Sequence, residues 1–128
     1  MVTLEQFSYC PTHSTHPPFC YDFHYVKPGI VAIFGDNGSG KSTLAQLMAG
    51  WYPDFLPGEI TGTGTLLGTP IGHIPLNEQS ATIQLVQQSP YLQLSGCTFS
   101  VEEEVAFGPE NLCLAEKEIM ARIDAALT

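Results

Sequence analysis

Positively charged residues are scarce in this 128-residue chain, which has four Lys and Arg residues against 13 Asp and Glu and a formal net charge of −9. The four are Lys27, Lys41, Lys117 and Arg122. A protein that binds a nucleic-acid backbone needs a basic stripe to neutralise phosphates, and an anionic membrane surface needs a polybasic segment. We therefore expect no nucleic-acid partner, and we expect any membrane contact to be made through another protein.

Long hydrophobic runs are also missing. Gly, Pro or a polar residue interrupts every apolar stretch well before the roughly 20 residues that a transmembrane helix requires. The segment 1–6 (MVTLEQ) lacks the basic start and the apolar stretch of a secretory signal. The sequence predicts a cytoplasmic protein.

Closely spaced cysteine pairs are absent as well, so no disulfide framework is indicated. The cysteines are far apart: Cys10, Cys20, Cys97 and Cys113. Cys10, His13, His16 and Cys20 do lie within eleven positions. Such a set could close a tetrahedral zinc site. The alternative is a flexible, proline-containing connection whose Cys and His residues ligate nothing.

The length of the chain suggests one domain. The alternation of apolar and polar residues and the positions of turn residues predict the order of its strands and helices. Strands are expected over 2–9 and 19–26, and a strand buried on both faces over 30–34 (IVAIF). A helix should begin near Lys41, with Leu44, Leu47 and Met48 facing the core and Gly50 ending it.

The rest of the chain reads as short elements. The Gly- and Pro-rich stretch 51–75 predicts short antiparallel strands, and 83–86 (IQLV) a further strand. Ser100 and Glu103 form a capping box, so a helix is expected over 101–107 before Gly108 and Pro109 stop it. A final helix is expected over 115–127.

The strongest motif is GDNGSGKS, residues 35–42, which matches the phosphate-binding P-loop pattern G-x-x-x-x-G-K-[ST]. Glycines allow successive N–H groups to point at a polyphosphate, and the N-terminus of the following helix adds its positive dipole end. Lys41 would reach the β- and γ-phosphates, and the Ser42 hydroxyl would ligate Mg²⁺. The alternative is a glycine-rich turn that caps an ordinary helix.

The run 35–44 (GDNGSGKSTL) resembles the Walker A motif of ABC-transporter ATPases. The segments QSP at 88–90, QL at 93–94 and VEEEVAFGPENL at 101–112 are similar to the Q-loop region of energy-coupling-factor ATPases, which power vitamin and transition-metal uptake. The resemblance implies an α/β fold: a RecA-like P-loop NTPase core (strand and helix 30–50), an antiparallel β-subdomain (51–87) and the start of a helical subdomain (88–128).

The resemblance also implies roles for single residues. Gln88 would be the Q-loop glutamine, approaching Mg²⁺ and the attacking water, although a solvated residue ending an edge strand is the alternative. Tyr9 would stack on adenine, or pack in the core. Residues 102–104 would lie near the coupling surface, or form a solvated helical turn. The ATP and Mg²⁺ ligands would come from Gly35, Asn37, Gly38, Ser39, Gly40, Lys41, Ser42 and Thr43.

The partners implied are a second ATPase subunit, identical or different, a transmembrane coupling subunit and a substrate-binding membrane subunit, with the chain peripheral to the inner face of the membrane. The family's Leu-Ser-Gly-Gly-Gln signature, its Walker B strand and its switch histidine have no counterpart in these 128 residues. The sequence therefore predicts a truncated ATPase domain that binds ATP without positioned hydrolysis.

Other functions remain as alternatives. The chain could be a non-catalytic remnant or an interaction fragment. A small P-loop kinase would use the same loop but usually needs several arginines, and Arg122 is the only one. A GTPase would need an Asn-Lys-x-Asp string, which the sequence lacks.

Overall fold

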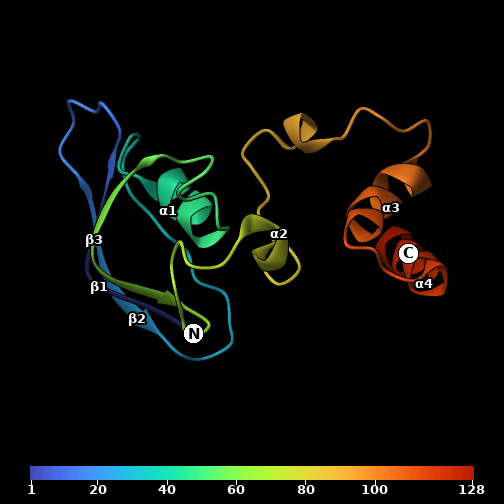
Figure 1. Ribbon diagram of the computed structural model, residues 1–128, viewed down its shortest axis with the longest axis horizontal. Helices are drawn as coiled ribbons and strands as arrows, with labels where there is room; N and C mark the ends of the chain where they lie inside the picture. Colours follow the sequence, from blue (N-terminus) through green and yellow to red (C-terminus); the bar gives the residue numbers. More distant parts are fainter. The chain divides into compact units, whose positions relative to one another are not determined.

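The computed structural model describes residues 1–128 and divides into two units, Met1–Leu85 and Val86–Thr128 (Figure 1). The first unit contains the strands and the two helices α1 and α2, and the second contains α3 and α4. None of the helices combines the length and the apolar character needed to cross a bilayer.

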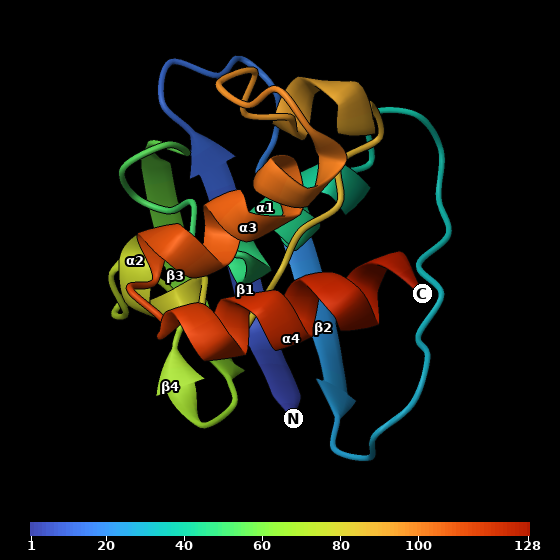
Figure 2. The same cartoon turned by 90° about the vertical axis from the view of Figure 1, so that its right-hand side faces the viewer.

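A four-stranded antiparallel sheet forms the base of the first unit (Figure 2). Its order is β2 (Phe19–Tyr25), β1 (Val2–Pro11), β3 (Gly58–Leu66) and β4 (Thr69–Pro70). β1 pairs with β2 on one side and with β3 on the other. The two N-terminal strands and the antiparallel strands within 51–75 are therefore confirmed.

A β-bulge in β1 turns two large side chains to the same face of the sheet. Strict alternation would place Leu4 and Phe7 on opposite faces, because they are an odd number of residues apart. The register of β1 shifts between these two residues, and Gln6 takes a positive φ of 46°. Leu4, Phe7 and Tyr9 consequently all point into the core, with exposures of 0 to 1%.

Helix α1 (Lys41–Met48) covers that face and supplies Leu44 and Leu47 to the core. Both side chains are buried, and Met48 is half-buried, as the helical spacing predicts. Gly50 follows the helix with a φ of 85°, and its N–H donates to the Leu47 carbonyl at 3.2 Å. The helix and its glycine end are therefore confirmed.

The predicted strand over 30–34 is wrong. These residues have no regular secondary structure, Ile30 is 100% exposed and Phe34 is 90% exposed. In Figure 2 the segment runs from the end of β2 to α1 without a strand beside it. An apolar, β-branched composition favours a strand, but the hydrogen bonds of a strand come from its neighbours, and no other segment pairs with this one.

The further short strand expected over 83–86 is wrong for the same reason. Residues 83–87 have no regular structure, and Val86 is 79% exposed. The sheet of the first unit is wholly antiparallel, and neither 30–34 nor 83–86 is part of it.

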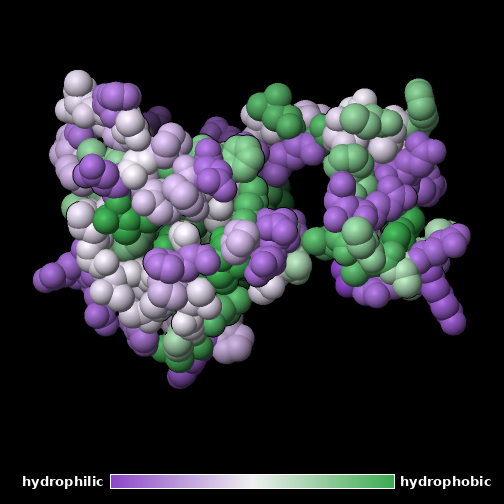
Figure 3. Space-filling view, in the orientation of Figure 1, coloured by the Kyte–Doolittle hydropathy of each residue, from purple (hydrophilic) through white to green (hydrophobic).

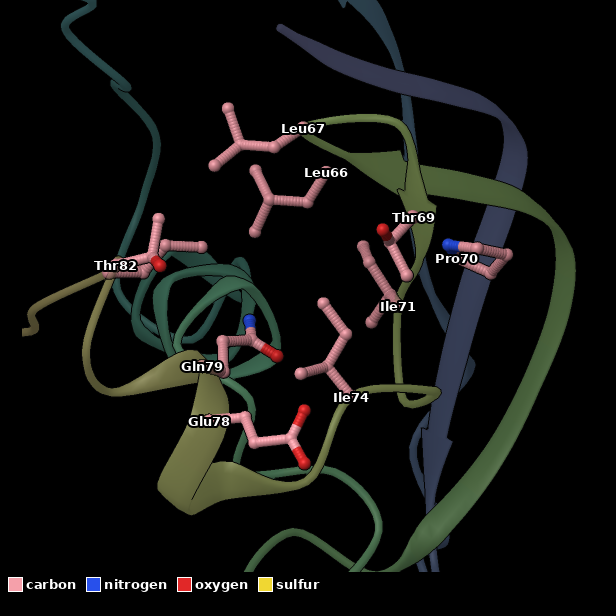
Figure 4. Close-up of a pocket in the computed structure, with 10 residues that line it drawn as sticks. Leu66, Leu67, Thr69, Pro70, Ile71, Ile74, Glu78, Gln79 and Thr82 are labelled. Atoms are coloured by element: carbon pink, nitrogen blue, oxygen red, sulfur yellow. The ribbon is translucent and has the colours of Figure 1, made fainter.

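A short helix that the sequence analysis missed, α2 (Leu76–Gln79), lies beside α1. Gln79 is only 6% exposed, and its amide Nε2 donates to the Met48 carbonyl at 2.6 Å. Next to Gln79 is a cavity of about 210 Å³ with mostly apolar walls, into which Leu66, Ile71 and Ile74 project (Figure 4). The lining includes no residue of the P-loop.

The second unit consists of η1 (Pro90–Gln93), α3 (Val101–Asn111) and α4 (Glu116–Leu127). α3 and α4 contact each other and bury Ala106 and Ile123. Hydrophobic atoms are exposed over η1 and the nearby loop (Figure 3), where Leu92 is 81% and Phe99 100% exposed. The last predicted helix is confirmed to within one residue.

Helix α3 begins where the capping box predicts and ends later than expected. The Ser100 hydroxyl accepts from the Glu103 N–H at 3.2 Å. Pro109 lies inside the helix instead of stopping it. Proline has no backbone N–H, so the helix loses a single hydrogen bond there. The true end is a Schellman motif in which Cys113 takes a positive φ of 54° and the Leu114 N–H donates to the Pro109 carbonyl.

Candidate phosphate-binding site

The glycine loop connects the exposed segment 30–34 to the N-terminus of α1. Its backbone turns tightly, since the Ser39 N–H donates to the Asp36 carbonyl at 3.2 Å. Gly38 and Gly40 have φ values of 81° and 91°, a region that favours glycine. Gly40 is the N-cap of α1, so the helix begins at Lys41 as predicted.

The Lys41 side chain folds back over this loop. Its ammonium Nζ donates to the carbonyl oxygens of Gly35 at 2.7 Å and Asp36 at 2.6 Å, and it lies 3.3 Å from the Ser39 hydroxyl. One cation is thus held at the loop by neutral oxygen atoms. An ammonium with such partners can exchange them for the oxygens of an anionic ligand.

The first turn of α1 adds a second source of positive potential. The first N–H groups of a helix have no partner within it, and they carry the positive end of the helix dipole. No acidic side chain occupies the first turn of α1. Ser42 is exposed there and Thr43 is half-buried. The Lys41 ammonium and the helix N-terminus therefore favour an anion at the same loop.

Two aromatic residues of strand β2 contact the glycine loop at Gly40, which was not predicted from the sequence. The Tyr21 hydroxyl donates to the Gly40 carbonyl at 2.8 Å. A Cβ atom on Gly40 would lie 2.6 Å from both the Phe19 ring and the Tyr21 hydroxyl oxygen. The alternating aromatics of β2 were the available signal, because they place Phe19 and Tyr21 on the face that meets α1.

Burial and nearby acidic groups raise the pKa of Tyr21 to about 12, with burial the larger cause and Cys20 and Tyr9 the smaller ones. The phenol therefore keeps its proton at neutral pH and remains a donor to Gly40. Beside it, a cavity of about 560 Å³ is lined by β2, by residues 31–35 and by Ser39 and Lys41.

Comparison with known proteins identifies the family of this chain. The sequence model described as ABC transporter matches residues 21–127, which is most of the chain. The chain belongs to the ABC transporter ATP-binding family. The family is built on a P-loop NTPase fold, in which the P-loop joins a strand to a helix. Here a helix follows residues 35–42, but the preceding residues 30–34 do not form a strand.

Three curated relatives illustrate this membership. A protein of Methanosarcina mazei named as an ABC transporter ATP-binding protein is 39% identical over 99% of this chain and 44% of its own length. One of Streptomyces coelicolor with the same description is 39% identical over 83% of this chain and 36% of its own length. A Bacillus subtilis protein named for HMP/thiamine import is 34% identical over 99% and 23%. The chain thus spans less than half of each relative.

Tyr9 of this ABC family member is a core residue in the structure. It is 0% exposed, its hydroxyl donates to the Pro57 carbonyl at 2.9 Å, and its ring meets Tyr52 edge to face at 6.3 Å. Burial, followed by Tyr52 and Cys10, raises its pKa. Tyr9 therefore packs in the core, as the alternative interpretation expects, because its position in β1 directs the side chain inward. The ring has no exposed face on which adenine could stack.

Gln88 lies in the second unit, exposed in a bend after the irregular segment 83–87. The P-loop belongs to the first unit, so the predicted role of Gln88 beside Mg²⁺ stays a prediction. Glu102 and Glu103 are exposed on the first turn of α3. The Glu103 carboxylate accepts from the Phe99 N–H at 2.7 Å, and the half-buried Glu104 carboxylate accepts from Ser95 and Thr98.

The four residues considered as zinc ligands do not form a metal site in the structure. No group of three or more His, Cys, Asp and Glu side chains is gathered as ligands. Cys10 is half-buried at the end of β1, and Cys20 is exposed on β2. His13 and His16 are both exposed in the connection between these strands.

Proposed function

We propose that residues 35–42 bind the phosphates of Mg·ATP, and that the chain is the ATP-binding part of an ABC importer of the energy-coupling-factor type. One observation carries this proposal: the Lys41 ammonium and the N-terminus of α1 meet at a single glycine loop. Both features attract a polyphosphate, and both come from a motif whose residue spacing is specific for nucleotides.

Each residue of the loop has a role in this proposal. Lys41 exchanges its carbonyl partners for oxygens of the β- and γ-phosphates, while the exposed Ser42 hydroxyl is available to Mg²⁺. Bound Mg²⁺ supplies charge neutralisation between those phosphates. The Thr43 side chain is a further ligand. The remaining ligands are backbone N–H groups of Gly35, Asn37, Gly38, Ser39 and Gly40. Gln88 is proposed to approach Mg²⁺ and the attacking water while sensing the transmembrane partner.

The assignment to the energy-coupling-factor branch rests on the string VEEEVAFGPENL at 101–112. The Bacillus subtilis relative is named for HMP/thiamine import, which supports a vitamin as cargo for that protein. We extend this to uptake of a vitamin or metal ion. The proposed assembly contains a second ATPase subunit, a transmembrane coupling subunit and a substrate-binding membrane subunit, with the chain on the cytoplasmic side of the membrane.

Calorimetric titration with Mg·ATP tests the proposal on the wild type, Lys41→Ala and Lys117→Ala. Lys117 is an exposed lysine of α4, so its removal changes the net charge equally without touching the loop. We expect saturable binding to the wild type and to Lys117→Ala. Lys41→Ala should bind about 10- to 100-fold more weakly, the equivalent of one charge-assisted hydrogen bond to phosphate.

Negligible heats for the folded wild type would contradict nucleotide binding and favour an interaction fragment without a nucleotide. Equal affinities for the wild type and Lys41→Ala would contradict the role assigned to the loop.

A further inference from the structure

We infer that Tyr21 is a positioning residue for the phosphate-binding loop, acting through its hydrogen bond to the carbonyl of Gly40. The inference rests on the proposed function, because it concerns the same loop, and it assigns a role to a residue of β2, outside the P-loop motif. Tyr21 makes no contact with the phosphates itself. It fixes the backbone that does.

The contact is specific in its geometry. The Tyr21 hydroxyl lies 2.8 Å from the Gly40 carbonyl oxygen, and the Leu44 N–H lies 2.9 Å from the same oxygen. A carbonyl oxygen has two lone pairs, so these two donors satisfy it completely. The peptide group between Gly40 and Lys41 is thereby held from β2 and from the first turn of α1 together.

Peptide planarity transmits this restraint to the ligand side. In a trans peptide the C=O and N–H groups point in opposite directions within one rigid plane. Fixing the Gly40 carbonyl toward β2 therefore directs the Lys41 N–H away from the sheet. That N–H is among the first donors of α1, the group that a phosphate at the helix N-terminus would meet.

The surroundings of Gly40 keep this peptide group from rotating. Gly40 is buried, with a φ of 91°, and Phe19 fills the space that a side chain would need. Tyr21 itself is held against Phe7, with ring centroids 6.4 Å apart. The rings of Phe19 and Tyr21 thus pack against the core, and the Tyr21 hydroxyl makes a polar contact with the loop.

The variant Tyr21→Phe removes that hydroxyl and keeps the ring. Tyr25→Phe is the matched control, because Tyr25 lies on the same strand and the same face but next to Gly29 instead of Gly40. Each protein is titrated with Mg·ATP and with Mg·tripolyphosphate, which has phosphates but no base. The backbone is observed through the ¹⁵N amide resonance of Lys41 and hydrogen exchange at Leu44, both without ligand.

We expect Tyr21→Phe to bind both ligands about three- to tenfold more weakly than the wild type, the effect of one hydrogen bond. Its Lys41 amide resonance should shift, and Leu44 should exchange faster. Tyr25→Phe should match the wild type in all four measurements. A general loss of stability would not produce this pattern, because it would not single out the Gly40–Lys41 peptide group.

Two results would overturn the inference. One is an unchanged Lys41 resonance in Tyr21→Phe, whatever the affinity. The other is weaker binding of Mg·ATP with unchanged binding of Mg·tripolyphosphate, which would make Tyr21 a contact for the base. Failure of the wild type to bind either ligand is a separate outcome that contradicts the proposed function, and the resonance and exchange data still report on the Tyr21 contact.

Discussion

Gln79 joins two helices end to side: its amide nitrogen lies 2.6 Å from the carbonyl oxygen of Met48, the last residue of α1. The last carbonyls of a helix have no partner within it. Here one of them accepts from a side chain that is 6% exposed. The C-terminal end of α1 is thus fixed by α2, while the N-terminal end is fixed by Tyr21.

Removing this contact should destabilise the first unit. We expect Gln79→Ala to lower the free energy of unfolding by about 1–3 kcal/mol, because the Met48 carbonyl loses its donor where water has little access. Asn77→Ala, an exposed change on the same helix, should stay within about 0.5 kcal/mol of the wild type. Urea unfolding followed by circular dichroism measures both, and equal values would refute the contact.

Two glycines of the P-loop should differ in their tolerance of a side chain. Gly38 and Gly40 share a positive φ, so alanine costs about 1–2 kcal/mol at either position. A Cβ on Gly38 meets nothing within 4 Å, whereas one on Gly40 would lie 2.6 Å from Phe19 and Tyr21. Gly40→Ala should therefore be the more destabilising by a further 1–3 kcal/mol or so. Chemical denaturation of the two variants in parallel decides this order.

Acid should release the loop before α3. Hydrogen bonds from the Thr98 hydroxyl and from the backbone and side chain of Ser95 lower the pKa of Glu104 below its ordinary value of 4.5. The stability from this carboxylate is present above pH 4.5 and is lost as pH falls through the lowered pKa.

The Ser95 amide proton should therefore move upfield in an NMR titration with a midpoint below pH 4.5. Glu104→Gln should abolish that transition, and Glu102→Gln, an exposed change on the same turn, should leave it intact. A midpoint at or above the ordinary value would contradict the contacts assigned to Glu104.

Alkaline pH should weaken the first unit through Tyr21. Its ordinary pKa of 10.0 applies to the unfolded chain, and burial raises the folded value to about 12. Between these values the unfolded state loses its proton while the folded state keeps it, so the stability gained from the neutral phenol is present below pH 10 and lost as pH rises through about 12. The stability difference between wild type and Tyr21→Phe should fall over this window in urea unfolding, and a constant difference would exclude the effect.

Local patterns predicted those parts of the fold whose partners are near in sequence. The strands β1 and β2, the helix α1 and the start of α3 follow from alternation, helical spacing and the Ser100 cap. The strands expected at 30–34 and 83–86 failed because an apolar run does not specify which segment will pair with it. Helix α2 was missed because four residues are too few to show helical spacing.

The candidate site was predictable in its motif and unpredictable in its supports. The P-loop pattern identifies Gly40 and Lys41 directly, because both occupy fixed positions of the motif. The alternating aromatics of β2 place Tyr21 on the face that meets α1, but alternation does not specify that its hydroxyl meets the Gly40 carbonyl. The inward position of Leu4 together with Phe7 depends on a bulge that no residue pattern in β1 revealed.

The Lys41 ammonium donates to the carbonyl oxygens of Gly35 and Asp36. These two oxygens therefore compete with any anionic ligand for the ammonium. In the proposed complex, phosphate oxygens would replace the carbonyls of Gly35 and Asp36 as partners of the ammonium, so the affinity would report the difference between two sets of partners. The two carbonyls would then accept from water or from new donors. Occupancy of the loop would thereby be coupled to the backbone of residues 35 and 36, which follow the exposed Phe34 in the chain.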